Sequence, residues 1–242
     1  MTVFNSTTQN NRRSERGNVL FLILIAVALF AALSYAVTQS TRSGGGDASR
    51  ETNLVNAAGI TQYPASIKTA ITRMVISNSV NPEELLFDTP STFGSLATDE
   101  DKANAVFYPT GGGASYVEAP ASVMASNTLG TWHFNGANRV VNIGTTEASL
   151  STTDADIIAF LPGVKKAVCD SIHAKLGISP TYTVITTIDT TSDMNYANQG
   201  IDITGGGSIT STALNGQPQG CFSDSAPSTS TVYTYYHVVS ER

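Results

Sequence analysis

One uncharged apolar run near the N-terminus constrains this chain more than any other feature. Residues 19–37 contain no charged side chain, and only Ser34 and Tyr35 interrupt their apolar character. As a helix the run would be about 28 Å long, enough to cross the hydrocarbon core of a bilayer. A helix that is apolar on every face suits lipid better than the half-wet core of a soluble domain. The run therefore predicts a membrane-embedded segment.

Three interpretations of this run are open. It is a retained anchor, a cleavable secretory signal with Ser34-Tyr35-Ala36 as a small-x-small cleavage site, or the buried helix of a soluble protein. The polar leader is long and the run exceeds a usual signal h-region, which favours the anchor. Arg12, Arg13 and Arg16 precede the run, whereas only Arg42 closely follows it. We therefore expect a single-pass protein of the bacterial inner membrane, with a cytoplasmic N-terminus and a periplasmic or extracellular C-terminal part.

Composition limits the partners of the remaining chain. The 242 residues carry 13% charged side chains and a net charge of −6. About 200 residues follow the apolar run, which suits one sizeable domain or two small ones. The sequence contains no basic cluster, so no nucleic-acid partner is expected.

The two cysteines, Cys169 and Cys221, have three possible states. An even count in an exported chain favours a disulfide. It would close a loop of about 50 residues and contribute about 3–4 kcal/mol in the chain-entropy model. The alternatives are two buried free thiols and a metal site in which Cys169 and His173, four residues apart on an expected helix, form one half.

A second helical stretch is expected after the apolar run. Gly44-Gly45-Gly46 should break or loosen the first helix, and Asp47 or Ser49 could cap the next one, which ends near residue 79. Pro64 lies inside it and should kink or divide it. Its apolar residues fall largely on one face: Leu54, Ala57, Ala58, Ile60, Ile67, Ala70, Ile71, Met74 and Val75.

Strand and turn signals dominate the second half of the chain. Residues 130–134 and 139–143 flank Asn135-Gly136, a strong hairpin signal. Helical spacing over residues 162–176, with Gly177 as the stop, predicts a helix packed on a sheet.

Further extended segments are predicted over residues 182–188 and 232–239, with a long surface excursion over 189–220 between them. Helical turns are possible near residues 83–87 and 99–106. The predicted fold is therefore α+β: a long N-terminal membrane-spanning helix continues into an amphipathic helix packed on an antiparallel β-sheet, with one further helix.

Sequence motifs for catalysis or cofactor binding are missing. The chain has no nucleophile elbow, phosphate loop, dinucleotide fingerprint or zinc-protease motif, so we expect neither an enzyme nor a cofactor. His133 and His237 lie in expected strands, where a structural role is commoner than a catalytic one. Asp189, Asp193 and Asp202 could offer oxygen ligands to calcium, but their spacing matches no EF-hand.

The N-terminus resembles that of type IV pilins and type II secretion pseudopilins. The resemblance rests on the basic leader, Gly17, the long apolar helix and the exported C-terminal domain, and it covers about the first 80 residues. It implies that a prepilin-type peptidase cuts after Gly17 and that Asn18 becomes the N-methylated first residue. Residues 1–17 would then be the leader, 18–43 the filament-core helix and 44–242 the exported domain.

The resemblance carries further implications for assembly. In this family the apolar helices bundle in the filament core and the globular heads coat its surface. Many pilins have a disulfide near the C-terminus, and Cys169 and Cys221 could serve as that bond.

Two residues depart from the family pattern. Asn18 stands where the family usually has Phe or Met, and Leu22 stands at the fifth mature position, where it usually has Glu. That glutamate is thought to neutralise the N-terminal amine of a neighbour, and a buried amine without a partner is costly. The departures favour a minor or initiating subunit, or an uncut anchored envelope protein, over a major self-stacking pilin.

The expected function is structural. The chain would be a subunit of a pilus-like or pseudopilus-like filament or secretion apparatus, and its partners would be other pilin-like subunits or itself, inner-membrane lipid and the prepilin-type peptidase. A membrane-anchored or secreted periplasmic binding module is the alternative, and an enzyme is third.

Overall fold

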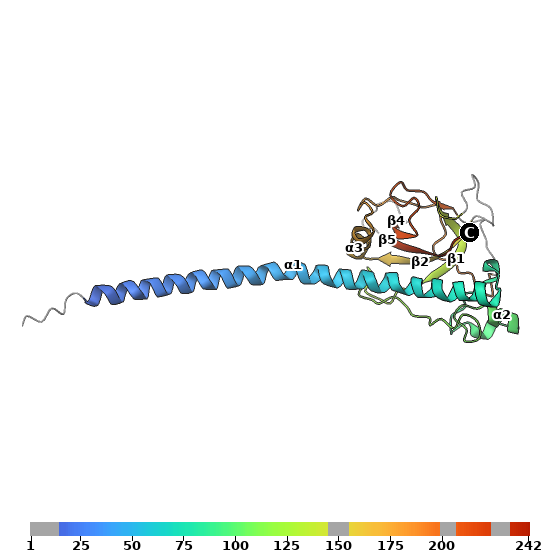
Figure 1. Ribbon diagram of the computed structural model, residues 1–242, viewed down its shortest axis with the longest axis horizontal. Helices are drawn as coiled ribbons and strands as arrows, with labels where there is room; N and C mark the ends of the chain where they lie inside the picture. Colours follow the sequence, from blue (N-terminus) through green and yellow to red (C-terminus); the bar gives the residue numbers. More distant parts are fainter. Residues whose placement is uncertain (1–14, 145–154, 199–206, 224–232) are drawn as a thin grey trace, which may run out of the picture. The chain divides into compact units, whose positions relative to one another are not determined.

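The chain forms two compact units that meet in sequence at Glu51 and Thr52. The computed structural model describes residues 15–144, 155–198, 207–223 and 233–242. Helix α1 (Glu15–Asn78) begins in the first unit, and its residues from Thr52 onward belong to the second. All other elements belong to this second unit, which we call the head (Figure 1).

Helix α1 continues through the two points at which the sequence predicts an interruption. Its helical assignment includes Gly44-Gly45-Gly46, and Pro64 lies inside it without dividing it. The glycines lower helix propensity by about 1 kcal/mol each relative to alanine, but propensity is a weak constraint. Pro64 is buried, so packing of its ring offsets the hydrogen bond that its missing N–H cannot make.

The head also contains shorter helical elements. They are η1 (Pro82–Glu84), η2 (Phe93–Ser95), α2 (Asp99–Asn104) and α3 (Lys166–Leu176). Helix α2 begins with a capping box, in which Thr98 Oγ1 accepts the N–H of Asp101 and the carboxylate of Asp101 accepts the N–H of Thr98. The helical turns expected near residues 83 and 99 are therefore present, although shorter than predicted.

Five strands form one mixed sheet. They are β1 (His133–Val140), β2 (Asp156–Val164), β3 (Ser208–Ile209), β4 (Gln219–Ser223) and β5 (Tyr233–Ser240). Their order is β3-β1-β2-β5-β4, and β3 pairs with β1 in parallel. The expected α+β class is confirmed, but the expected purely antiparallel sheet is wrong because of this parallel pair.

The predicted hairpin at Asn135-Gly136 is wrong. Both residues lie inside β1, whose pairing with β2 shifts in register between Asn135 and Asn138. The Nδ2 groups of these two asparagines donate to the carbonyl oxygen of Asp189 at 3.1 and 2.6 Å. The dipeptide therefore lies at an irregularity of β1, where the two asparagine side chains bind a loop that is distant in sequence.

The helix predicted from residue 162 begins four residues later. Pro162 belongs to β2, and α3 starts at Lys166. The pairing of β2 with β5 shifts between Leu161 and Val164, and such an irregularity tolerates a proline. The predicted stop is confirmed, since Gly177 caps α3 in the left-handed conformation with φ 69°.

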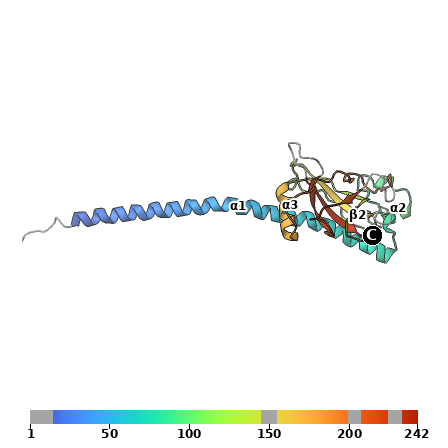
Figure 2. The same ribbon diagram turned by 90° about the horizontal axis from the view of Figure 1, so that it is seen from above.

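Both faces of the sheet are buried. Along β5, Tyr233, Tyr235 and Val239 join one apolar cluster, whereas Tyr236 and Val238 join the other. The extended segment predicted over 232–239 is thus present as a strand whose apolar side chains alternate between the two clusters. Five residues of the predicted apolar face of α1 also belong to the first cluster: Ala57, Ile60, Ile67, Ile71 and Met74. Figure 2 shows this part of α1 beside the sheet, while Leu54 and Ala58 remain exposed.

Candidate functional site

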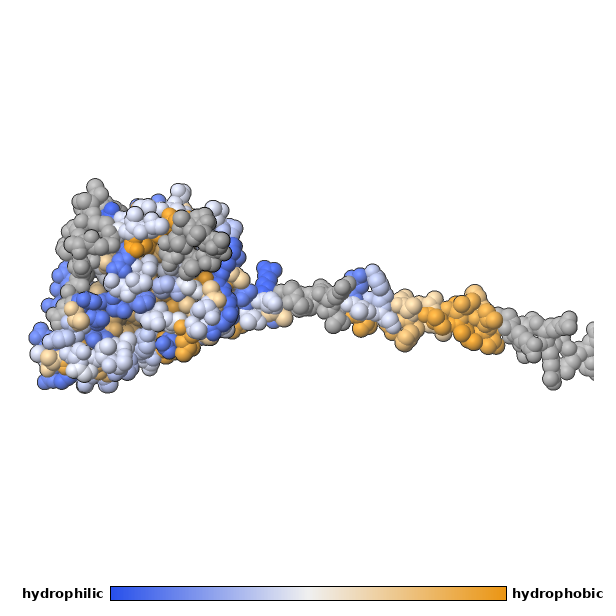
Figure 3. Space-filling model, turned by 180° about the vertical axis from the view of Figure 1, so that it is seen from behind, coloured by the Kyte–Doolittle hydropathy of each residue, from blue (hydrophilic) through white to orange (hydrophobic). Residues whose placement is uncertain are grey.

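The apolar segment of α1 is the first candidate site. Val19–Gln39 has a mean hydropathy of 2.7, and none of this 21-residue segment is buried within the structure. Figure 3 shows apolar residues gathered over this part of the helix, whereas most of the visible head surface is hydrophilic. By length and composition the segment could cross a membrane, although a signal sequence would meet the same test.

The residues of the predicted processing site lie in this helix. Gly17 and Asn18 fall within the helical range of α1, and Leu22 follows one turn later with 59% of its surface exposed. Leu22 therefore presents an apolar side chain outward. The cut after Gly17 stays a prediction.

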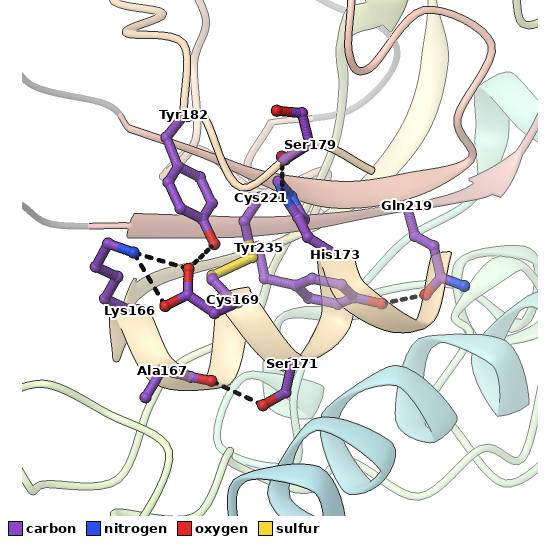
Figure 4. Close-up of a disulfide and its surroundings, with 11 residues drawn as sticks. Lys166, Ala167, Cys169, Ser171, His173, Ser179, Tyr182, Gln219, Cys221 and Tyr235 are labelled. Atoms are coloured by element: carbon purple, nitrogen blue, oxygen red, sulfur yellow. Dashed lines mark hydrogen bonds and ion pairs between the residues drawn. A yellow bond between two sulfur atoms is a disulfide. The ribbon is translucent and has the colours of Figure 1, made fainter. Parts of the chain in front are cut away.

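The disulfide predicted as one alternative joins α3 to β4. Cys169 and Cys221 are bonded, with 5.9 Å between their Cα atoms and 52 residues between them in sequence. Both are buried in the first apolar cluster (Figure 4). The bond removes the alternatives of two free thiols and of a metal half-site at Cys169 and His173.

His173 completes the connection between α3 and β4. Its Nε2 accepts the backbone N–H of Cys221 at 2.9 Å, and its Nδ1 lies 2.9 Å from the carbonyl oxygen of Ser179. Burial lowers the pKa of His173 below its ordinary value, although the contact with the carbonyl oxygen of Ser179 acts in the opposite direction. The buried ring serves as a neutral acceptor in the core of the head.

A polar cluster covers the outer side of this connection. The Asp170 carboxylate accepts hydrogen bonds from Lys166 and from the Tyr182 hydroxyl, both at 2.8 Å. The ring of Tyr182 stacks on His173 with 4.8 Å between centroids. Burial, followed by the hydrogen bond to Asp170, raises the pKa of Tyr182. The phenol therefore stays protonated at neutral pH and acts as a donor.

Two of the three aspartates that could offer oxygen ligands to calcium have other partners. The Asp193 carboxylate accepts the N–H of Phe134 at 2.8 Å and lies 3.2 Å from Nδ1 of His133. The Asp189 carboxylate accepts the N–H groups of Thr191 and Ser192. Asp202 lies outside the described residues. Within the described part of the chain, no three His, Cys, Asp or Glu side chains group as metal ligands.

One buried carboxylate was not identified from the sequence. Asp156, at the start of β2, is fully buried, and its two oxygens accept the N–H of Val140 at 2.9 Å and that of Arg242 at 3.4 Å. Burial raises the pKa of Asp156 to about 7 despite these hydrogen bonds. An aspartate at the edge of an apolar run was the available signal. The side chain ties Val140, at the end of β1, and Arg242, beyond β5, to the start of β2.

His237 is, with His133, one of the two histidines for which a structural role is expected. It lies in β5 with Nδ1 at 3.0 Å from the Tyr235 hydroxyl, which donates to Oε1 of Gln219 at 2.8 Å. Because that hydroxyl proton points to Gln219, Nδ1 of His237 carries the proton of the shared hydrogen bond. Burial, with a smaller contribution from Lys68, lowers the pKa of His237 to about 4. These contacts give His237 a structural place in the sheet.

Comparison with known proteins adds no relative. No protein-family model, no curated protein sequence and no solved structure matches this chain.

Proposed function

We propose that this chain is a structural subunit of a pilus-like or pseudopilus-like cell-envelope filament or secretion apparatus, assembled through its apolar N-terminal helix. The observation that carries the proposal is the exposed segment Val19–Gln39, which precedes a head with its own core. An apolar helix that the described part of the chain leaves exposed must be covered by lipid or by other helices. A subunit that passes from the membrane into a helical bundle meets both requirements in turn.

The proposal includes a route and partners. The chain is inserted in the bacterial inner membrane with its N-terminus in the cytoplasm and its head outside. The prepilin-type peptidase removes residues 1–17 and leaves Asn18 first. Other pilin-like subunits then cover the apolar segment in place of lipid.

Leu22 favours a minor or initiating role in that assembly. Its side chain is apolar and 59% exposed, so it offers no charge to the N-terminal amine of a neighbouring copy. A stack of identical copies would bury each Asn18 amine without a carboxylate, and an unpaired buried charge is strongly unfavourable. A partner subunit with an acidic residue next to the Asn18 amine would supply the missing carboxylate.

Imaging of assemblies tests this function. Wild type and Leu22→Glu are each expressed with the processing peptidase and no other pilin-like subunit, then examined by negative stain, with Leu22→Gln as a polar control without charge. We expect few filaments from wild type and from Leu22→Gln, and more from Leu22→Glu. Abundant wild-type filaments without a gain in Leu22→Glu would contradict the minor role.

A periplasmic binding module is the second candidate. The compact unit from Thr52 to Arg242 has its own apolar core, so the head could act after removal of the apolar segment as a signal peptide. A secreted module of this kind requires a mature chain that begins at Val37, after the small-x-small site at residues 34–36, whereas a membrane-anchored one keeps the apolar segment.

A further inference from the structure

Charge is distributed unevenly over the head. Residues 52–242 contain eight Lys and Arg against sixteen Asp and Glu, a net charge of −8. Residues 165–175 reverse this balance, because the segment contains three lysines, Lys165, Lys166 and Lys175, and one acidic residue, Asp170. The segment is thus a cationic pole, with a charge of +2, on an otherwise acidic head.

This pole lies at the end of the head where the chain enters from the apolar segment. Nζ of Lys165 donates to the carbonyl oxygen of Ser122 at 2.8 Å and to Oδ1 of Asn127 at 2.9 Å. The Ser122 hydroxyl donates in turn, at 3.3 Å, to Oδ1 of Asn56, which is the fifth residue of the head. Figures 1 and 2 both draw α3 at this end of the head and α2 at the opposite end.

The outward side of the pole carries lysines among small residues. Lys166, Ala167, Ala174 and Lys175 are exposed on α3. Asp170 is already bonded to Lys166, whereas Lys175 forms no ion pair with any residue that the structure describes. We call this set of four exposed residues the α3 face.

Exposed apolar side chains lie close in sequence to Asn56 and Asn127, which the contacts of Lys165 connect to the start of α3. Val55, near the start of the head, is 71% exposed, and Leu129, in the loop that Lys165 holds, is 60% exposed. Lysines beside exposed apolar side chains are typical of surfaces that lie against an anionic membrane.

The reach of the chain fits such a contact. Twelve residues, 40–51, separate the candidate span from the head. They extend about 18 Å as a helix and about 40 Å when fully extended. A head held so near the bilayer meets lipid headgroups at a high effective concentration, so even a weak attraction populates the contact.

We infer that the α3 face docks the head on the anionic phospholipid surface of the membrane that holds the apolar segment, before assembly. This inference rests on the proposed insertion of Val19–Gln39 in the bilayer. Lipid suits the face better than an acidic protein does, because the four residues of the face are two lysines and two alanines, and none of them is an aromatic or arginine anchor.

Energy transfer from the head to the bilayer tests the inference. The full chain carries a dye on Ala174→Cys and is reconstituted in vesicles that contain an acceptor-labelled lipid, either phosphatidylcholine alone or phosphatidylcholine with phosphatidylglycerol. We expect stronger transfer in the anionic vesicles and a decline with added salt, which screens the attraction. Lys175→Gln should lower the ratio of docked to undocked heads about fivefold.

Lys102→Gln is the matched control. It removes one lysine charge from α2, at the end of the head opposite α3, and should leave the transfer unchanged. Equal transfer in the two kinds of vesicle, or equal effects of Lys175→Gln and Lys102→Gln, would overturn the inference. Contact between the α3 faces of two copies that does not depend on lipid charge would assign the face to a protein and overturn it as well.

Carbonate extraction of the same vesicles separates this inference from the proposed function. A chain that resists extraction but shows equal transfer contradicts membrane docking alone. A chain released by carbonate contradicts the insertion on which both proposals depend.

Discussion

The backbone N–H of Cys221 donates a hydrogen bond to Nε2 of His173 across 2.9 Å, so the ring is neutral at this nitrogen. The proton on Nδ1 then points to the carbonyl oxygen of Ser179. The disulfide joins the same two elements, since Cys169 precedes His173 by one turn of α3. A covalent bond and a buried hydrogen bond therefore hold α3 on β4 together.

Replacement of His173 should destabilise the head. His173→Leu leaves the buried N–H of Cys221 without an acceptor, and we expect the free energy of unfolding to fall by about 1–3 kcal/mol. Urea denaturation at neutral pH measures this change. Lys175→Gln, exposed on the same helix, is the control and should change stability by less than about 0.5 kcal/mol. Equal stability of His173→Leu and wild type would contradict the role given to the ring.

Asp156 should make the head less stable at alkaline pH. Its folded pKa of about 7 is higher than the value near 3.9 expected in the unfolded chain. The folded state therefore holds a proton that the unfolded state has lost. The stabilising contribution is complete below about pH 4 and disappears as pH rises through 7.

Asp156→Asn removes this pH dependence. The amide oxygen can still accept the N–H of Val140, and the side chain cannot ionise. We expect the variant to gain stability over wild type, by on the order of 2–4 kcal/mol, as pH rises from about 5 to 8.5. Denaturation curves at both pH values measure it, with Asp193→Asn as the comparison. A wild-type profile in Asp156→Asn would show that the carboxyl is ionised throughout.

Loss of the disulfide should weaken the head without removing its core. Cys169→Ser opens a loop with a sequence separation of 52 and should lower stability by about 3–4 kcal/mol. Calorimetry of the wild-type protein with and without reductant compares the stability of the head with and without the disulfide, free of any substitution. Two titratable thiols in protein from an oxidising compartment would contradict the bond.

A charge in the apolar segment should remove the chain from the membrane. Ala28→Arg places a guanidinium near the middle of Val19–Gln39 and should raise the free energy of insertion by about 2.5–3.5 kcal/mol. Membrane fractionation measures the loss, and Ala28→Leu is the apolar control. Unchanged fractionation of Ala28→Arg would show that the segment does not lie in lipid.

The sequence predicted the elements whose apolar side chains recur with a simple period. The buried stripe of α1 and the two faces of β5 follow simple periods of 3.6 and 2, and both are found. The disulfide followed from an even cysteine count and the expected export.

The central strand β2 could not be predicted in the same way. Ile157, Ala159 and Leu161 enter one cluster while Ile158 and Phe160 enter the other, so the run is apolar without alternation. Such a run cannot be distinguished from a helix by periodicity. The hairpin prediction at Asn135-Gly136 failed because it considered only neighbouring residues. The side chain of Asn135 in β1 instead donates hydrogen bonds to residues more than 50 positions away in the sequence.

The identity of the first residue of the mature protein tests the central claim most directly. The chain is expressed in a bacterial host together with a prepilin-type peptidase, purified from membranes, and its N-terminal peptide is analysed by mass spectrometry. The proposed pilin-like subunit predicts a chain that begins at Asn18, carries N-methylation and lacks residues 1–17. A chain that begins at Val37, or one that keeps its leader intact, would contradict it.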